Sequence, residues 1–274
     1  MKIISQVLKI ILVFVFTSVF YNSLQAQETA MAAAGNSAEE LAKKLANPIA
    51  SLISVPFQSN FDVGIGQYHG SKMVLNIQPV IPITISKSWN LITRTIMPIV
   101  SQYDVTGEGT RNSGFGDIVF TGFFSPKDSK ITWGVGPALL IPTASNKYIG
   151  SGKFGIGPSI VALKQSNGWT YGGLANHLWS VAGSDSRKDI SATFLNPFIS
   201  YNWKSGAGLT LNLEYTHDWV NDINVLVFNF PLFSAVTKFG NQTVSFGLGP
   251  RLHFAPEIRP EYGIRGAITL VFPK

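Results

Sequence analysis

The sequence predicts an all-β protein, a closed antiparallel up-and-down transmembrane β-barrel of about 12 strands with a short N-terminal helix. The first observation is strict alternation. From Leu209 to Trp219 every second residue is Leu, Tyr, His or Trp, and the residues between them are Thr, Asn, Glu or Asp. Such alternation is typical of a strand with one apolar and one polar face. The neighbouring run from Trp169 to Trp179 extends over roughly 33 Å, which after tilting matches the apolar band of an outer-membrane barrel.

The second observation is the composition. Hydrophobic residues make up 45% of the chain and charged residues 13%, whereas a soluble surface usually carries about 25–35% charged residues. After Ala26 no uninterrupted apolar run reaches the ~18 residues that a membrane-spanning helix needs. Lipid-facing strands account for both facts. A water-soluble β-sandwich or barrel is the alternative fold, and it is disfavoured because side chains cannot fill the interior of a 12-stranded barrel.

The N-terminus predicts export. Residues 1–26 combine a basic start, the apolar run Ile10–Phe20 and a cleavage site at Leu24-Gln25-Ala26, which together are typical of a signal peptide. An N-terminal membrane anchor is the alternative interpretation of this segment.

Residues 27–50 are expected to form an N-terminal periplasmic segment. Ser37-Ala38-Glu39-Glu40 fits a capping box, which predicts a helix of about two to three turns that ends before Pro48. The segment is either a loose arm before the barrel or a plug in its mouth. Residues 51–274 are assigned to the barrel itself.

Twelve alternating runs predict the strands of the barrel. They lie at about 53–63, 73–85, 89–101, 115–125, 130–143, 153–165, 168–182, 189–203, 206–219, 224–236, 242–254 and 261–272. Short connections at 86–88, 126–129, 166–168, 204–206 and 240–241 alternate with longer ones at 64–70, 102–114, 144–152, 183–188 and 255–260, and 218–222 is a short exception. This pattern matches periplasmic turns and external loops, with both termini in the periplasm.

The six tryptophans sort by strand end. Trp89, Trp133, Trp169 and Trp203 lie beside short turns, and Trp179 and Trp219 lie toward the long loops. Indole rings prefer the boundary between lipid and water because their body is apolar and their N–H is polar. The sequence therefore predicts an aromatic girdle at each edge of the membrane.

The charged residues within strands take the polar parity. Because an Arg or Lys on the lipid face near the midplane costs about 2–4 kcal/mol, they are expected to face the lumen. The predicted lumen-lining residues are Gln58, Asn60, Asp62, Asn76, Gln78, Arg94, Asp117, Asn212, Glu214, Asp218, Arg251 and Arg265. They form either a surface that selects solutes or a network of ion pairs that closes the lumen, and the sequence favours closure.

Several other functions are disfavoured. The chain has no cysteine and its four histidines have no paired spacing, so no metal site and no cofactor is expected.

The formal charge of +6 falls by two when Lys2 and Lys9 leave with the signal peptide. The remaining basic residues are scattered, so no nucleic-acid partner is expected. An outer-membrane phospholipase would need a cooperating Ser and His, but Ser180 and His177 take opposite faces, and no enzyme is predicted.

One pattern occurs three times along the chain: Trp133-Gly134-Val135-Gly136-Pro137, Phe154-Gly155-Ile156-Gly157-Pro158 and Phe246-Gly247-Leu248-Gly249-Pro250. Glycine on the inward face makes room in the lumen, and proline within a strand predicts a bend or bulge. With residues 45–58, Trp89-Asn90-Leu91-Ile92-Thr93-Arg94 and Gly114-Phe115-Gly116-Asp117-Ile118, these motifs resemble the outer-membrane family named for the "MetA-pathway of phenol degradation". The resemblance covers nearly the whole mature chain.

That resemblance implies a β-barrel that carries small solutes, including hydrophobic or aromatic ones, passively across the outer membrane. The alternative is a closed structural or adhesive barrel that acts through its external loops, such as Gln102–Gly114. The expected partners are outer-membrane lipid, an unidentified small solute and the barrel-assembly machinery that inserts such proteins. A monomer is expected.

Overall fold

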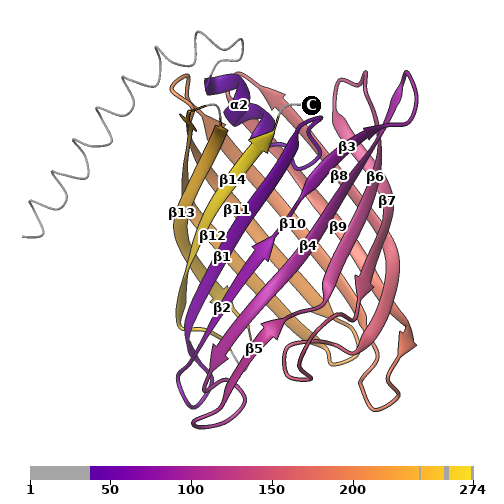
Figure 1. Ribbon diagram of the computed structural model, residues 1–274, viewed down its shortest axis with the longest axis vertical. Helices are drawn as coiled ribbons and strands as arrows, with labels where there is room; N and C mark the ends of the chain where they lie inside the picture. The colour runs from indigo at the N-terminus through magenta and orange to yellow at the C-terminus, as the bar shows by residue number, and fades with distance from the viewer. Residues whose placement is uncertain (1–37, 241, 256–258, 273–274) are drawn as a thin grey trace, which may run out of the picture.

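The structure, a computed structural model, describes residues 38–240, 242–255 and 259–272. The predicted signal peptide and the first part of the N-terminal segment therefore lie outside the described residues. The described chain forms a closed antiparallel barrel with one short helix, α2 (Ala38–Leu45), at one end (Figure 1). We call this the helix end of the barrel and the opposite one the loop end.

Closure is complete because the first and last strands pair with each other. β1 pairs antiparallel with β14 from Ile53↔Phe272 to Val63↔Tyr262. The strands are β1 (Ile53–Ile65), β2 (Gly70–Ile77), β3 (Val80–Thr84), β4 (Trp89–Tyr103), β5 (Arg111–Phe115), β6 (Ile118–Pro126), β7 (Thr132–Ile141), β8 (Lys153–Ser166), β9 (Trp169–Gly183), β10 (Ser191–Asn202), β11 (Ala207–Asp218), β12 (Ile223–Phe239), β13 (Gln242–Phe254) and β14 (Tyr262–Phe272).

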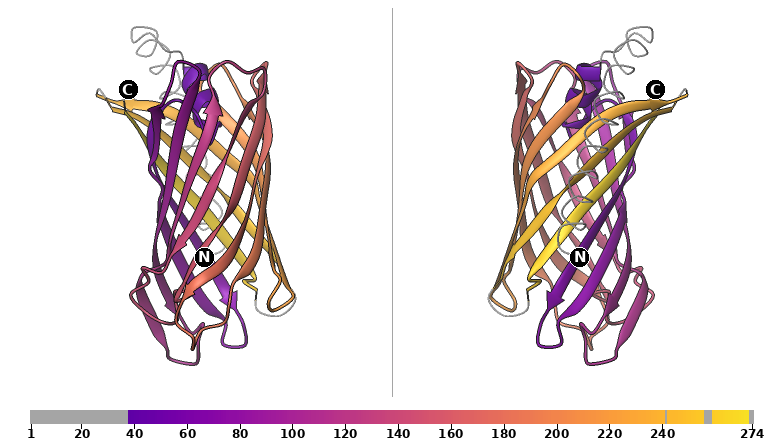
Figure 2. Two further views of the ribbon diagram at one scale, coloured as in Figure 1. Left: turned by 90° about the vertical axis from the view of Figure 1, so that its right-hand side faces the viewer. Right: turned by 90° about the vertical axis from the view of Figure 1, so that its left-hand side faces the viewer.

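These elements make twelve wall strands, as the sequence predicts, because two wall strands are each interrupted once. β2 and β3 both pair with β4 and are separated only by Gln78 and Pro79. β5 and β6 likewise both pair with β4, on its other side, and are separated by Gly116 and Asp117. Proline has no N–H to donate to a ladder, which explains the first interruption. All strands tilt in the same sense around the barrel (Figure 2).

The outer face of the barrel is apolar. Along β8 the outward residues Phe154, Ile156, Pro158 and Ile160 alternate with inward residues that are buried, and Ile156 and Ile160 are 42% and 51% exposed. Large exposed Phe, Ile, Leu, Tyr and Trp side chains occur on strands all around the barrel. A continuous apolar surface of this kind is not compatible with water. Among the described residues, no helix is both long and apolar enough to cross a bilayer.

The repeated Gly-Pro pairs bring neighbouring strands unusually close together. A Cβ atom on Gly136 would lie 1.8 Å from the carbonyl oxygen of Gly122, and one on Gly157 would lie 1.7 Å from that of His177. A Cβ on Gly249 would lie 2.3 Å from the Pro231 carbonyl, opposite a register shift in β12. These glycines are therefore required by the close approach of backbone, in addition to the room that they leave in the lumen.

Two connections at the loop end are shorter than the sequence predicts. The segment 64–70 is a tight turn of residues 66–69, because Gly66 and His69 adopt positive φ and let β1 and β2 extend toward each other. Similarly, β4 and β5 reduce the predicted loop 102–114 to residues 104–110. Long connections remain at 142–152 and 184–190.

The helix end is covered from inside by the chain that precedes β1. Helix α2 has the predicted length and ends before Pro48, and Ala38, Leu41 and Ala42 bury one face against Val236 of β12. The capping residue Ser37 lies outside the described residues. Figure 1 shows α2 lying across the mouth of the barrel.

Candidate functional site in the lumen

A cluster of ion pairs lies inside the barrel, and we call it the charged cluster. Its members are Asn60 and Asp62 of β1, Glu214 of β11, Asn229 of β12, Arg251 and His253 of β13, and Arg265 of β14. Within it, Arg265 Nη1 lies 2.8 Å and Arg251 Nη1 3.6 Å from the Glu214 carboxylate. The polar residues of these alternating strands therefore face the interior of the barrel, as the sequence predicts.

Hydrogen bonds satisfy most of the charges in this cluster. Arg251 donates to Asp62 Oδ1 at 3.3 Å, to Asn60 Oδ1 at 3.1 Å and to Asn229 Oδ1 at 3.0 Å. Arg265 Nε also donates to Asn60 Oδ1, at 2.8 Å. Both guanidinium groups are buried, and buried charges are tolerated only when they are paired in this way.

The charged cluster occupies one side of the lumen. Its members come from neighbouring strands between β11 and β1, on either side of the β14–β1 closure. Arg94 of β4 extends this side, because its Nη2 donates to Gln78 Oε1 at 2.6 Å and it interacts electrostatically with Glu214. No described residue on β6–β10 contributes an ion pair to the cluster.

The other side of the lumen, near the helix end, is apolar, and we call it the apolar cluster. It consists of Ile49, Val80, Ile92, Phe123, Val161, Leu163 and Leu174, with Phe194 and Phe198 packed against them. Phe123, Ile92 and Val161 are almost fully buried. The sequence interpretation missed this cluster, because it expected the inward face to carry amides, hydroxyls and charges.

Ile49 is the only described residue of the apolar cluster that is not part of the wall. It is 2% exposed, and its backbone N–H donates to Asn47 Oδ1 at 2.9 Å. Two further bonds anchor the same segment to the wall: Asn90 Nδ2 donates to Ser51 Oγ at 3.0 Å, and Gln165 Nε2 donates to the Lys43 carbonyl at 2.7 Å. The segment from α2 to Ser51 therefore fills the lumen at the helix end.

Not all of the predicted lumen residues lie in these two clusters. Asn212 joins the charged side by accepting a hydrogen bond from Asn229 at 3.1 Å. Gln58 and Gln78 line a cavity beside Arg94. For Asn76, between Leu75 and Ile77 on β2, no partner within the described residues joins it to either cluster.

Asp117 and Asp218 differ from the expectation, because they hold connections at the loop end. Asp117 accepts from Ala144 N at 3.1 Å and from Ser151 N and Oγ, both at 2.6 Å. Asp218 accepts from Val220 N at 2.9 Å and Asn221 N at 3.2 Å. Both carboxylates accept hydrogen bonds from backbone N–H groups of these connections.

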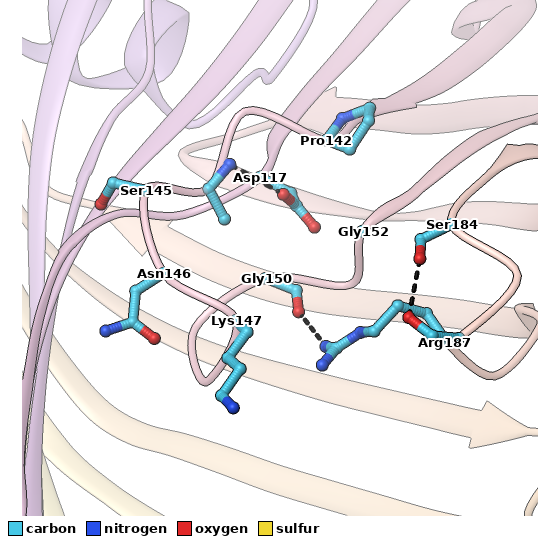
Figure 3. A pocket seen from close by; sticks show the side chains of 11 residues that line it. Asp117, Pro142, Ser145, Asn146, Lys147, Gly150, Gly152, Ser184 and Arg187 are labelled. Carbon is cyan, nitrogen blue, oxygen red and sulfur yellow. Dashed lines mark hydrogen bonds between the residues drawn. The ribbon is translucent and has the colours of Figure 1, made fainter.

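Asp117 also lines a cavity of about 470 Å³ between two connections at the loop end, residues 142–152 and 184–190 (Figure 3). Arg187 crosses from the second loop and donates to the carbonyl groups of Gly150 and Ser151. Nearby, Lys153 Nζ lies 2.9 Å from Asp189, and this hydrogen bond holds the pKa of the Asp189 carboxylate below its ordinary value. The two loops are thus fastened to each other and to the barrel rim.

The tryptophans lie at the two ends of the barrel as the sequence predicts. At the helix end Trp89 contacts Trp133 at a centroid distance of 5.9 Å, and Tyr201 stands between Trp169 and Trp203. At the loop end Trp179 and Trp219 contact histidines. Their role as a membrane girdle stays a prediction.

Two histidines, His177 and His217, contact the tryptophans at the loop end. His177 lies 4.1 Å from the Trp179 ring, shares a 2.7 Å hydrogen bond with Thr193 Oγ1 and lies 3.3 Å from Ser191 Oγ. Trp219 Nε1 donates to the same threonine at 2.9 Å. Ser180, the serine nearest to His177 in the sequence, donates its hydrogen bond to Asp189 and not to this histidine. In the described part of the chain, no three His, Asp or Glu residues come together as a metal site.

The closed sheet, its apolar outer face and the charged cluster in its interior define an outer-membrane β-barrel. A family model described as "Putative MetA-pathway of phenol degradation" matches residues 51–259, about three quarters of the chain. The chain belongs to this family. No curated protein matches the sequence.

The chain also matches solved structures. The COG4313 outer membrane channel from Pseudomonas putida F1 superposes with a TM-score of 0.64 at 14% identity, covering 82% of this chain and 97% of that chain. The beta domain of the Bordetella autotransporter BrkA gives 0.44 at 10% identity over 80% and 100% of the two chains. OmpT of Vibrio cholerae, an outer membrane protein, gives 0.37 at 7% identity over 80% and 98%.

Proposed function

We propose that the protein is a passive outer-membrane channel for small solutes, including hydrophobic or aromatic ones, and that the segment from α2 to Ser51 is its plug. The helix end then faces the periplasm and the fastened loops face outward. One chain closes its own sheet, so the proposed unit is a monomer, inserted by the barrel-assembly machinery. The protein carries solute and catalyses no reaction in this proposal.

One observation carries the proposal: at the helix end, a segment that is not part of the barrel wall lies in the lumen and packs against the wall. The ion pairs of the charged cluster follow one side of the barrel, whereas Ile49 inserts among Phe123, Leu163 and other wall residues on the apolar side. A barrel with a purely structural role needs no such insertion. The likeness in fold to a channel and the membership of the family support the same conclusion.

Ile49→Asp tests the plug. A carboxylate at a position that is 2% exposed among apolar side chains is strongly disfavoured, so the segment should leave the lumen. In planar lipid bilayers we expect the variant to show a severalfold larger single-channel conductance than the wild type.

Lys43→Asp is the control, since it places the same residue in the same segment outside the apolar cluster, and it should conduct like the wild type. Correct folding is checked by the shift in gel mobility between heated and unheated samples. If folded Ile49→Asp passes neither ions nor solutes into liposomes, the closed structural or adhesive barrel becomes the better account.

A further inference from the structure

A cavity of about 160 Å³ lies between the plug and the barrel wall. Its apolar lining comes from Leu45, Pro48 and Leu52 on one side and from Pro56 and Val80 on the other. Cavities of about 150 Å³ with apolar walls take up a benzene-sized ring. The cavity therefore has room for a compact apolar group.

One wall of this cavity is cationic, because Arg94 lines it together with Gln58 and Gln78. A guanidinium has five N–H donors, and Arg94 uses one of them for the 2.6 Å bond to Gln78 Oε1. Within the described residues no carboxylate lies within ion-pair distance of Arg94. Glu214, which interacts with it at longer range, is already paired with Arg265 and Arg251. Lys44 also lines the cavity, but its ammonium pairs with Glu40 at 2.8 Å.

The surrounding lumen has too few carboxylates for its cations. Among the described residues, the carboxylates that interact with Lys72, Arg94, Arg251 and Arg265 are Asp62 and Glu214. These four cations against two carboxylates leave an excess of two positive charges. An anion that reaches Arg94 is consequently attracted by the lumen as well as by the guanidinium.

We propose that this cavity binds a small monocarboxylate with a compact apolar body, such as an aromatic acid. The carboxylate pairs with Arg94, for which planar two-point bonding is the favoured geometry, and the apolar body lies between the plug and the wall. This inference deepens the proposed channel function, because it names the class of solute that the lumen recognises.

Binding of 4-fluorobenzoate to the purified, folded barrel tests the proposal without any need for conduction. The ¹⁹F line of the ligand should broaden in the presence of the wild type. Arg94→Gln should weaken the affinity by about tenfold or more, because hydrogen bonds to charged groups are the strong ones. The neutral analogue 4-fluorobenzyl alcohol should bind more weakly and be insensitive to this substitution.

Arg111→Gln is the matched control, since it removes the same charge from β5 at the loop end, where Arg111 lies over the Tyr103 ring. It should bind 4-fluorobenzoate like the wild type. Ala50→Phe is a second variant that fills the cavity from the plug side without altering the barrel wall, and it should also abolish binding. It keeps the proposal testable if Arg94→Gln does not fold.

The proposal is overturned if the wild type does not broaden the 4-fluorobenzoate line, or if Arg94→Gln or Ala50→Phe binds as the wild type does. These outcomes are independent of the channel test. If Ile49→Asp conducts but the wild type does not bind the carboxylate, the channel proposal stands and the binding-site proposal is rejected. If the carboxylate binds but Ile49→Asp does not conduct, the binding-site proposal stands and the channel proposal is rejected.

Discussion

The two clusters in the lumen differ in where their parts come from. The charged cluster is built entirely from strand residues that pair across the barrel closure, such as Asp62, Arg251 and Arg265. The apolar cluster instead needs Ile49 from the preceding chain to complete it. The first belongs to the wall and the second joins the wall to the plug. In the proposed channel, the charged cluster would stabilise the wall and the apolar cluster would hold the plug.

The difference also concerns how each cluster responds to losing one member. Ion pairs are costly to break because the remaining charge stays buried, whereas an apolar contact loses only its transfer and cavity energies. In addition, Glu214 and Asn60 each contact two arginines. The charged cluster should therefore fail as a unit, and the apolar cluster should weaken step by step.

Glu214→Gln should have the largest effect on stability. Removing this charge leaves Arg251 and Arg265 buried without their shared carboxylate, and breaking a buried ion pair typically costs about 3–5 kcal/mol. The free energy of unfolding, measured with guanidinium in detergent by tryptophan fluorescence, should fall by about that amount.

The exposed Glu108→Gln provides the control, with an expected change of less than about 0.5 kcal/mol. Adding Arg265→Gln to Glu214→Gln should restore part of the loss, because it removes one of the uncompensated charges. A Glu214→Gln barrel as stable as the wild type would contradict the distinction between the clusters.

The sequence predicted an inward orientation for five of the seven residues of the charged cluster and did not single out Asn229 or His253. Arg251, Glu214 and Asp62 cannot face lipid at low cost, so their positions in the alternating pattern predicted which face of each strand lies inward. It could not show which charges would pair, since Glu214 and Arg265 lie on strands separated by two others. Phe123 and Leu174 gave no comparable signal, because an apolar side chain is accepted on either face.

The sequence likewise did not predict the contacts of Asp117, and it left residues 27–50 open between a loose arm and a plug. Asp117 takes an inward parity, but it sits in the break between β5 and β6, where backbone N–H groups of residues 144 and 151 compete for its carboxylate. The short helix was predictable from its own sequence. Its position was not, because Ile49 finds its partners on β3, β4, β6, β8 and β9, which are distant in the chain.

Ile49→Ala sharpens the comparison by weakening only the plug. Truncation of a buried Ile to Ala commonly costs about 2–5 kcal/mol. Here the loss should appear as release of the segment, with amide hydrogen exchange of residues 46–50 accelerated by about tenfold or more. The free energy of unfolding of the barrel itself should change much less than in Glu214→Gln. An equal loss in both variants would show that the clusters are not separate.

Ile85→Ala is the matched truncation on the exposed outer face, and it should leave the exchange of the plug unchanged. If exchange in this control rises as it does in Ile49→Ala, the effect does not come from the lumen.

Asp189→Asn should have the smallest effect, because its ion pair with Lys153 lies outside both clusters and its carboxylate is exposed. The folded-state pKa of Asp189 lies below the ordinary value of 3.8, mainly through the hydrogen bond from Lys153. The stabilisation is therefore present above pH 3.8 and is lost as the pH falls through the folded-state pKa.

At pH 7 the variant should show faster hydrogen exchange in loop 184–190 and an unchanged free energy of unfolding. The difference from the wild type should shrink as the solution is acidified below pH 3.8, whereas Asp185→Asn in the same loop should show neither effect. A global loss of stability in Asp189→Asn would mean that the loop end, and not only the charged cluster, holds the barrel together.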